Sequence, residues 1–159
     1  MSMELKNYLI KYPKLKIYYK YFMTNFFPYI IKGESIKDNR GKLFSCNHFD
    51  MSRVKRIYSI ENINSLYIRG WKGHKIETRW FFATKGSILI NTILISHLEN
   101  HHPEPDIKTF KLNEDNLNIL EVPPGFATSI KQLSNGDRIC VFADYHLGVS
   151  GDEDLRWDL

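Results

Sequence analysis

From Lys42 onward, the chain is a succession of short runs rich in β-branched and aromatic residues, separated by Gly, Asn, Asp and Pro. Such runs are typical of β-strands, because branched and aromatic side chains pack well on a pleated surface. The pattern predicts strands over residues 42–49, 54–60, 65–69, 79–84, 87–94, 107–112, 116–122, 128–133 and 138–144.

Many short strands with no helical pattern between them favour one class of fold. A parallel α/β sheet needs a crossover helix between strands, whereas a barrel or a double-sheet jelly roll is built from strands and turns. Residues that favour tight turns lie between the runs, at Lys85-Gly86, Pro123-Pro124-Gly125 and Ser134-Asn135-Gly136-Asp137. The sequence therefore predicts an all-β jelly-roll barrel.

The beginning of the chain has a different composition. Residues 5–31 hold five lysines and nine aromatic residues, and Pro13 and Pro28 are expected to interrupt or end helical turns. We expect a helical or irregular aromatic arm over residues 1–33 and a barrel domain over residues 34–159. The arm either packs its aromatic side on this domain or on a second subunit, or lies on an anionic membrane surface or a partner.

The composition narrows the classes of ligand and cellular setting. With 159 residues and 43% hydrophobic content, the chain can form one domain with a sizeable core. The 22 Lys and Arg residues exceed the 18 Asp and Glu residues, which gives a formal net charge of +4. This mild excess suits an anionic ligand and does not indicate a nucleic-acid-binding protein.

The two cysteines, Cys46 and Cys140, lie far apart and form no close-spaced metal or redox motif. Their spacing favours a reduced cytoplasmic setting over a disulfide framework. Lysines interrupt residues 1–20, so no secretory signal is expected there. The sequence also lacks an uncharged apolar run long enough to span a bilayer.

Several short motifs, taken in order along the chain, resemble those of one enzyme family. They are Asp38-Asn39-Arg40-Gly41-Lys42-Leu43, Val54-Lys55-Arg56-Ile57-Tyr58, Arg69-Gly70-Trp71-Lys72-Gly73-His74-Lys75, Val122-Pro123-Pro124-Gly125-Phe126-Ala127 and Glu153-Asp154-Leu155-Arg156-Trp157-Asp158. This ordered set is similar to the cupin-fold sugar-nucleotide enzymes that include dTDP-4-dehydrorhamnose 3,5-epimerase and the dTDP-4-keto-6-deoxyglucose 3,4-ketoisomerases. The resemblance covers residues 36–159 and leaves the aromatic arm unmatched.

The resemblance implies a cupin-type barrel that acts on a 4-keto-6-deoxy nucleotide sugar in polysaccharide or glycan biosynthesis. In that reaction a base removes a proton next to the ketone, and reprotonation of the enolate on another face or atom gives the epimer or isomer. The site must supply a base, a proton donor and positive charge for the diphosphate or the enolate oxygen. No organic cofactor is implied, and the family and the arm both point to a homodimer.

Three arginines are candidates for binding the substrate. Arg69 matches the family arginine that contacts the nucleotide diphosphate, since a guanidinium offers paired donors to phosphate oxygens. Arg40 invites the same interpretation, and its alternative is to close a local turn with Asp38. Arg79 stands where the epimerases have a lysine that faces the enolate oxygen. For Arg69 and Arg79 the alternative is a surface ion pair.

The candidates for catalysis are His74, Lys72 and Tyr145. His74 matches the second histidine of the ketoisomerase motif. A neutral imidazole can accept a carbon-bound proton near neutral pH, so His74 is a candidate base. The alternative is that His74 is a packed, hydrogen-bonded residue of the core. Lys72 stands at the position of the family's first histidine. As an ammonium it can hold a phosphate or an enolate oxygen, whereas to act as a base near neutral pH it needs a strongly lowered pKa. Tyr145 is either a proton donor or a core tyrosine.

Other positions depart from the family pattern. The proton-donating tyrosine of the epimerases falls on Cys140 here, and a histidine of their P-x-G-F-A-H motif becomes Thr128. These replacements favour an alternative function, in which a non-catalytic cupin binds a sugar nucleotide or a carbohydrate, or an accessory subunit docks through its arm.

A metal site is not expected. Cupin metal ligands fall at positions that read Lys72, His74, Glu77 and Thr128 here, so two of the four expected ligands are lost. A second group of histidines lies beside Pro103-Glu104-Pro105, where a surface loop is favoured over a metal site; its members are His97, His101 and His102.

Overall fold

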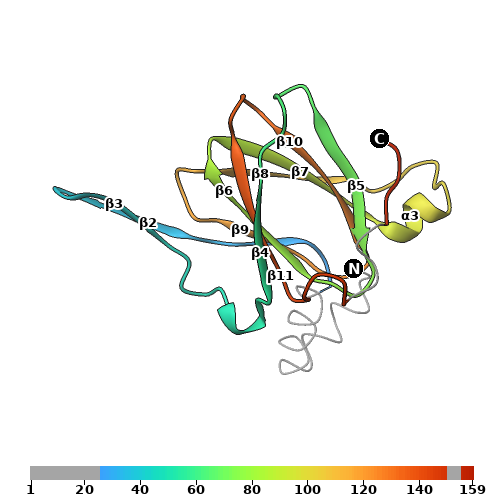
Figure 1. Cartoon of the computed structure of the whole chain (residues 1–159), viewed down its shortest axis with the longest axis horizontal. Helices are drawn as coiled ribbons and strands as arrows, with labels where there is room; N and C mark the ends of the chain where they lie inside the picture. Colours follow the sequence, from blue (N-terminus) through green and yellow to red (C-terminus); the bar gives the residue numbers. More distant parts are fainter. Residues whose placement is uncertain (1–25, 150–154) are drawn as a thin grey trace, which may run out of the picture.

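The computed structural model describes residues 26–149 and 155–159. Within these residues, two antiparallel sheets pack face to face, and a separate hairpin extends away from them (Figure 1). The five-stranded sheet has the order β1 (Tyr29–Ile31), β9 (Ile119–Val122), β6 (Arg79–Lys85), β11 (Arg138–Ala143) and β4 (Arg56–Ile60).

The four-stranded sheet has the order β5 (Ile68–His74), β10 (Phe126–Gln132), β7 (Ser87–Leu94) and β8 (Lys108–Asn113). The hairpin consists of β2 (Glu34–Asp38) and β3 (Gly41–Ser45). Two short helices complete the described elements, the 3-10 turn η1 (Met51–Arg53) and α3 (Ile95–Glu99). No helix in the described ranges is long and apolar enough to cross a membrane.

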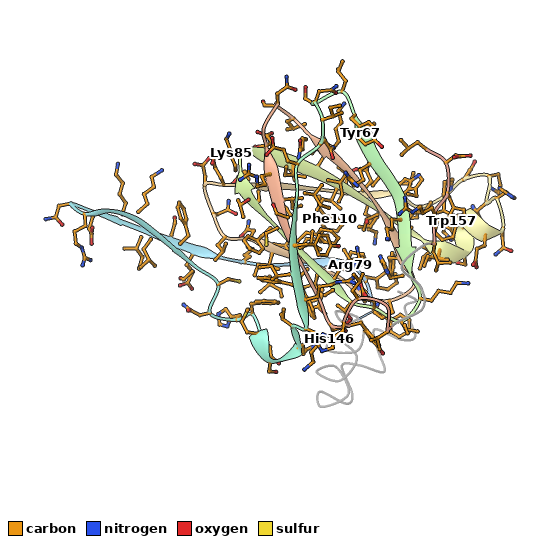
Figure 2. All side chains as sticks on the ribbon, in the orientation of Figure 1. Tyr67, Arg79, Lys85, Phe110, His146 and Trp157 are labelled. Carbon is orange, nitrogen blue, oxygen red and sulfur yellow. The ribbon has the colours of Figure 1, made fainter. Side chains whose placement is uncertain are left out.

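The main core lies between the two sheets and follows the alternation of side chains along each strand. Figure 2 shows side chains filling this space. The five-stranded sheet and the four-stranded sheet both contribute buried apolar residues to it, among them Phe81, Leu120, Ile139 and Val141 from the first and Ile88, Ile90, Leu112 and Ile130 from the second. The prediction of an all-β, double-sheet fold is confirmed.

Each strand predicted from the sequence overlaps a strand of the structure, from β3 to β11. The sequence analysis assigns residues 29–31 to the N-terminal arm, but the structure pairs β1 with β9 and sets Tyr29 opposite Glu121. The barrel therefore begins before residue 34, because the aromatic and branched residues of this run also suit a strand. Residues 1–25 of the predicted arm lie outside the described residues.

Two of the predicted turns meet at one buried carboxylate. Asp137 is 5% exposed, and its Oδ2 accepts hydrogen bonds from the backbone N–H of Ser87 at 3.2 Å and of Ser134 at 2.9 Å. Gly86 has a φ of +68°, and a Cβ atom there would lie 1.8 Å from Asp137 Oδ1. The turn after β6 thus needs glycine both for its backbone and for the space that Asp137 occupies.

Candidate functional site

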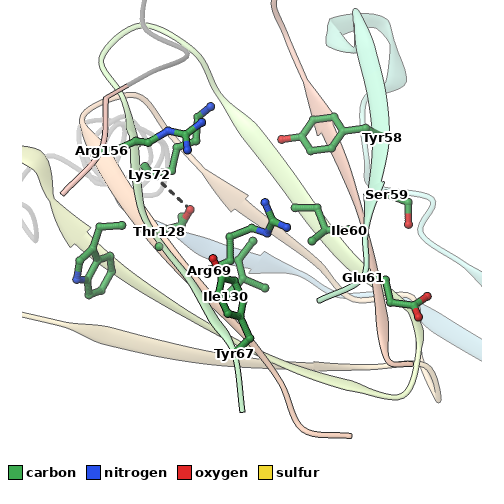
Figure 3. Close-up of a pocket in the computed structure, with 12 residues that line it drawn as sticks. Tyr58, Ser59, Ile60, Glu61, Tyr67, Arg69, Lys72, Thr128, Ile130 and Arg156 are labelled. Carbon is green, nitrogen blue, oxygen red and sulfur yellow. Dashed lines mark hydrogen bonds between the residues drawn. The ribbon is translucent and has the colours of Figure 1, made fainter. Parts of the chain in front are cut away.

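A cavity of about 430 Å³ lies beside β4 and β5. β4 is an edge strand of the five-stranded sheet, and β5 is an edge strand of the four-stranded sheet. Its wall combines aromatic, aliphatic and cationic side chains, and Figure 3 shows them facing one another across the space. The main contributors are Tyr58 and Ile60 of β4, Arg69 and Lys72 of β5, Thr128 and Ile130 of β10, and Arg156 from the C-terminal segment.

Three cationic side chains line this cavity, from Arg69, Lys72 and Arg156. One carboxylate, that of Glu61, also lines it, and it forms an ion pair of 2.7 Å with Arg138. The wall therefore carries an excess of positive charge, which suits an anionic ligand.

Arg156 reaches the cavity because residues 155–157 pair with the edge of β5. The backbone N–H of Trp71 donates to Trp157 O at 3.0 Å, Trp157 N–H donates to Trp71 O at 3.1 Å, and Gly73 N–H donates to Leu155 O at 3.0 Å. This pairing sets Arg156 directly opposite Lys72. It also covers an edge strand, which would otherwise leave backbone groups unpaired.

The side chain of Trp157 anchors the same segment. It packs on the outer face of the four-stranded sheet against a buried cluster that contains Trp71 and Ile95, near α3 (Figure 2). Gly73 allows this approach, because a Cβ atom there would lie 2.7 Å from the Trp157 ring. The segment is thus held by backbone pairing on one side and by ring packing on the other.

A network of charged residues is buried beside the cavity. Glu77 is 1% exposed, and its Oε1 accepts from Arg79 Nε at 2.6 Å and from Arg56 Nη2 at 3.1 Å. Arg79 Nη1 in turn donates to the Tyr58 hydroxyl at 2.6 Å. His74 Nδ1 lies 3.7 Å from Glu77 Oε1. The buried carboxylate of Glu77 is therefore next to Arg56, Arg79 and His74. Through Arg79 it is also linked to Tyr58, which lines the cavity.

Burial raises the pKa of the Tyr58 phenol above its ordinary value of 10.0. The guanidinium groups of Arg79 and Arg56, which lie close to the ring, lower that pKa but do not outweigh the burial. Tyr58 is therefore neutral at physiological pH, with its proton in place.

The structure brings Arg69 and Lys72 together on the cavity wall, as the sequence analysis expects of a common site. His74 is two residues beyond Lys72 on β5, so it points to the same inner side of the strand. It is 4% exposed and stands beside Glu77, and it is not among the residues that line the cavity. Arg79 is 9% exposed and paired with Glu77, so a surface ion pair does not describe it.

Besides His74 and Arg79, which are buried next to the cavity, two further predicted site residues are absent from its wall. Arg40 is exposed at the turn of the β2–β3 hairpin, and its Nη2 donates to Asp38 at 2.6 Å. This is the local turn contact that the sequence analysis gives as the alternative role of Arg40. Tyr145 follows β11, is half-buried, and is absent from the cavity wall.

The positions that depart from the family pattern lie on different faces of the barrel. Thr128 lines the cavity, and its hydroxyl donates to Lys72 O at 3.4 Å. Cys140 faces the other way, into an outer cluster with Trp80 and Phe142. Because β11 alternates, its neighbours Ile139 and Val141 face the core instead.

No group of three or more His, Cys, Asp and Glu side chains is arranged to hold a metal ion among residues 26–149 and 155–159. The second histidine group lies in and after α3. There, the rings of His97 and His102 stack with their centroids 4.7 Å apart, and His101 and His102 are exposed.

The sequence analysis missed Tyr58, Glu77 and Arg156 as parts of the site. Tyr58 ends the Val54-Lys55-Arg56-Ile57-Tyr58 motif, and Arg156 lies in the last of the motifs that resemble the family. Both were visible as members of motifs, but only the fold shows that they face the cavity. The sequence pattern places Glu77 only among the positions of cupin metal ligands, and the structure pairs it with two arginines instead.

No protein-family model matches the sequence, and a search of characterised proteins finds no significant match. Solved structures do share the fold. A sugar 3,4-ketoisomerase from Thermoanaerobacterium thermosaccharolyticum, in complex with TDP, has a TM-score of 0.62 and 23% identity, with 79% of this chain and 85% of that chain covered.

Two further structures resemble this chain to a similar extent. A 3,4-ketoisomerase from Helicobacter canadensis has a TM-score of 0.59 and 22% identity, with 77% of this chain and 86% of that chain covered. The dTDP-4-dehydrorhamnose 3,5-epimerase from Elizabethkingia anophelis has a TM-score of 0.58 and 17% identity, with 83% and 81% covered. The chain therefore has the fold of the sugar-nucleotide 3,4-ketoisomerases and 3,5-epimerases, the family that its motifs resemble.

Proposed function

We propose that this chain is an isomerase or epimerase of a 4-keto-6-deoxy nucleotide sugar, of the 3,4-ketoisomerase or 3,5-epimerase type. The observation that carries the proposal is the convergence of Arg69, Lys72 and Arg156 on one cavity of a barrel with the fold of those enzymes. Two of the structures with this fold contain TDP and TDP-4-keto-6-deoxyglucose.

In this proposal Arg69 and Arg156 bind the diphosphate of the substrate. A guanidinium presents several N–H donors in a fixed plane and matches two phosphate oxygens at once. The two side chains come from different segments, β5 and residues 155–157, and both line the same cavity. A diphosphate between them would replace part of its hydration shell with fixed donors.

The proposed base is His74. Its Nδ1 stands 3.7 Å from the buried carboxylate of Glu77, which favours a proton on Nδ1 and leaves the lone pair on Nε2. That nitrogen can then take a proton from the sugar carbon next to the ketone. Lys72 lies on the same side of β5 and lines the cavity, and in this proposal its ammonium stabilises the negative oxygen of the enolate.

Solvent exchange tests the proposal directly. The protein is incubated with TDP-4-keto-6-deoxyglucose in deuterated water, and proton NMR follows the carbons next to the ketone. We expect deuterium at C3 or C5 together with a new sugar product. TDP-glucose is the matched control, because it lacks the ketone that acidifies those protons. No exchange into the keto sugar would contradict the proposed reaction.

A binding protein without turnover is the second candidate. It is favoured by His74, which is 4% exposed and is not among the residues lining the cavity. Such a protein would be stabilised by TDP against thermal unfolding and would give no deuterium exchange with the keto sugar. Stabilisation and exchange together select the enzyme, so the two measurements separate the candidates.

We also propose a homodimer, supported by the β2–β3 hairpin that extends from the barrel (Figure 1). Both strands are exposed, and they include large apolar side chains, with Ile36 62% and Leu43 59% exposed. Because an isolated two-stranded hairpin is marginally stable in water, contact with a second copy accounts for it. The predicted role of Arg40 in substrate binding requires this hairpin to reach the cavity of that second copy.

The remaining proposals concern the cell. We propose that the reaction occurs in the cytoplasm during polysaccharide or glycan assembly, supported by two cysteines, Cys46 and Cys140, that form no disulfide. The part of the predicted arm that precedes β1 is proposed to contact either an anionic membrane surface or a partner. Co-sedimentation with anionic liposomes, before and after deletion of residues 1–25, separates these two roles.

A further inference from the structure

We infer that a second pocket, between α3 and the C-terminal segment, binds a neutral sugar that carries no nucleotide. The pocket has a volume of about 590 Å³, against about 430 Å³ for the cavity beside β4 and β5. The two share Gly70 and Arg156 as lining residues, so they adjoin at the C-terminal segment. The inference goes beyond the proposed reaction and does not depend on it. The wall of this α3 pocket consists of Gly70, Leu98, His101, Arg156, Trp157 and Asp158.

Two elements frame the α3 pocket, and both are anchored to the four-stranded sheet. Leu98 of α3 and Trp157 of the C-terminal segment pack against the same buried cluster, which includes Trp71. Figure 1 shows the C-terminal segment beside α3, and Figure 2 labels Trp157 at this place. Lys75, which follows β5, also contacts α3, where its Nζ lies 2.6 Å from Glu99 Oε1. The walls are therefore in place before a ligand binds, which lowers the cost of binding.

His101 has an unusual backbone conformation at the pocket wall. Its φ is +48°, and it is the only residue other than glycine with a positive φ among residues 26–149 and 155–159. A left-handed backbone is unfavourable for a residue with a side chain, and it persists where neighbouring contacts impose it. Here His102 donates its backbone N–H to His97 O at 2.9 Å, and the rings of these two residues stack. The loop therefore keeps a strained residue at the pocket, which is typical of a binding site.

The polar side chains of the pocket are available to a ligand. Neither the His101 imidazole nor the Asp158 carboxylate has a hydrogen-bond or ion-pair partner within the described part of the chain. Arg156 belongs to the same segment as Asp158 and lines the same pocket. The α3 pocket thus offers an acceptor at Asp158, donors at Arg156, and both functions at His101.

The charges of the wall favour a neutral ligand. An anion in this pocket meets the carboxylate of Asp158, and a cation meets the guanidinium of Arg156. A hydroxyl group both donates and accepts, so a molecule with several hydroxyls can satisfy a guanidinium and a carboxylate at once. This mixture of charges separates the α3 pocket from the cavity beside β4 and β5, where three cationic side chains suit a diphosphate.

The apolar part of the wall suits a sugar ring. Trp157 and Leu98 provide an aromatic and an aliphatic surface, and the C–H groups of a pyranose ring pack on surfaces of this kind. Small-molecule sites usually have volumes of about 300–1,000 Å³, so the pocket has room for a monosaccharide or a disaccharide. A hexose combines the hydroxyls and the apolar ring that the two parts of the wall require.

Saturation-transfer difference NMR tests the inference on the full chain. The probes are the neutral hexoses D-glucose, D-galactose and L-rhamnose, each measured with and without TDP. We expect saturation transfer to at least one hexose, and we expect TDP to leave this transfer in place. D-glucosamine, a cation, and D-glucose 6-phosphate, an anion, should give weaker transfer than the neutral hexoses. No transfer to any hexose, its loss on addition of TDP, or stronger transfer to a charged sugar would overturn the inference.

Two variants locate the bound sugar. Asp158→Ala removes the acceptor and is expected to raise the Kd of the sugar by roughly 10-fold or more, the usual effect of losing a hydrogen bond to a charged group. His101→Gly removes the imidazole and suits the left-handed backbone. The sugar should therefore bind more weakly, while the melting temperature stays the same or rises. This pair of results separates a binding role of His101 from a structural one.

Asp106→Ala is the matched control, because Asp106 is an exposed carboxylate in the loop after α3 and does not line the pocket. It is expected to bind the sugar as the wild type does. Equal weakening in Asp106→Ala and Asp158→Ala, or wild-type affinity in both pocket variants, would assign the sugar to another place. Deuterium exchange without sugar binding removes the second site alone, whereas sugar binding without exchange removes the proposed reaction alone.

Discussion

Glu77 is a carboxylate enclosed by the barrel, with 1% of its surface exposed. It holds Arg79 at 2.6 Å and Arg56 at 3.1 Å, and both guanidinium groups flank the ring of Tyr58. Charged groups are stable in a protein interior only when they are paired and hydrogen-bonded in this way. The network thus neutralises Glu77 and, through Arg79, fixes the position of the Tyr58 hydroxyl.

Arg69 is the residue whose role in binding can be tested most simply. Charge-assisted hydrogen bonds contribute about 1.5–3 kcal/mol each, so Arg69→Ala is expected to weaken TDP binding by roughly 10- to 100-fold. Isothermal titration calorimetry measures this affinity. Lys111→Ala is the control, since Lys111 is exposed on β8 away from the cavity. Equal weakening in the two variants would mean that only net charge matters.

Two side chains, Tyr58 and Cys140, are expected to make the stability of the fold depend on pH in the alkaline range. Burial raises the pKa of Tyr58 above 10.0 and that of Cys140 above 9.0. The folded protein therefore holds these protons more tightly than the unfolded chain does. This stabilisation of the folded state is fully present below the ordinary pKa values of the two groups. It is lost as the pH rises through their raised pKa values in the folded protein.

We expect the free energy of unfolding, measured with urea, to fall as the pH rises above 9.0 to 10.0, the ordinary pKa values of these groups. Tyr58→Phe removes one of the ionising groups, so the decline in this variant is expected to be shallower. The same decline in wild type and variant would show that Tyr58 does not contribute.

Individual site residues were predictable where a motif fixed both the residue and its place on a strand. Arg69 and Lys72 belong to one motif on β5, and both line the cavity. Arg156 was not predictable, because its position depends on pairing between segments that are more than 80 residues apart, at Lys72 and Arg156. Likewise, nothing in the sequence around Glu77 shows that its carboxylate is buried with two arginines.

Two glycine turns illustrate what the short connections between strands require. Gly86 has a φ of +68°, with Asp137 in the space of a Cβ atom, whereas Gly125 has a φ of +88° and open space around it. Gly125→Ala is expected to cost about 1–2 kcal/mol, the usual cost of a left-handed backbone for a residue with a side chain. Gly86→Ala should cost more, because Asp137 must also move. Urea unfolding of both variants tests this order, and the reverse order would contradict it.

The C-terminal segment is an element with two separable roles, stability and ligand binding. Trp157→Ala removes a partly buried ring from the cluster around Trp71 and is expected to lower the free energy of unfolding by about 2–3 kcal/mol. It should also weaken TDP binding, because the segment that carries Arg156 loses its anchor. Arg156→Ala should weaken TDP binding with little change in the melting temperature. Differential scanning fluorimetry with and without TDP distinguishes these results. Unchanged affinity in both variants would remove the segment from the site.

Strands with a clear alternation or a run of branched residues were predictable, which includes β6, β7, β10 and β11. β2 was missed because the sequence Glu-Ser-Ile-Lys-Asp holds a single apolar residue and is exposed throughout. α3 has five residues, too few to give a helical period. These elements depend on contacts with other segments of the chain, and such contacts cannot be inferred from the local sequence.

The β2–β3 hairpin allows the proposed homodimer to be tested. Ile36 and Leu43 pair directly across β2 and β3 and are 62% and 59% exposed. Replacing both by Ser is expected to convert a dimer into a monomer in sedimentation velocity experiments, because the apolar contact is lost. The control is Lys37→Ser, a change at a charged position of the same hairpin. A monomeric wild type, or a double variant that remains dimeric, would contradict the proposed contact.

The cavity beside β4 and β5 is expected to bind a nucleoside diphosphate sugar through its cationic wall. A crystal structure of the protein with TDP tests this expectation. We predict the diphosphate in contact with Arg69 and Arg156, near Lys72, with the open space beside Tyr58 left for the sugar. TDP bound elsewhere on the molecule, or crystals grown with TDP that contain none, would show that this cavity does not bind the ligand.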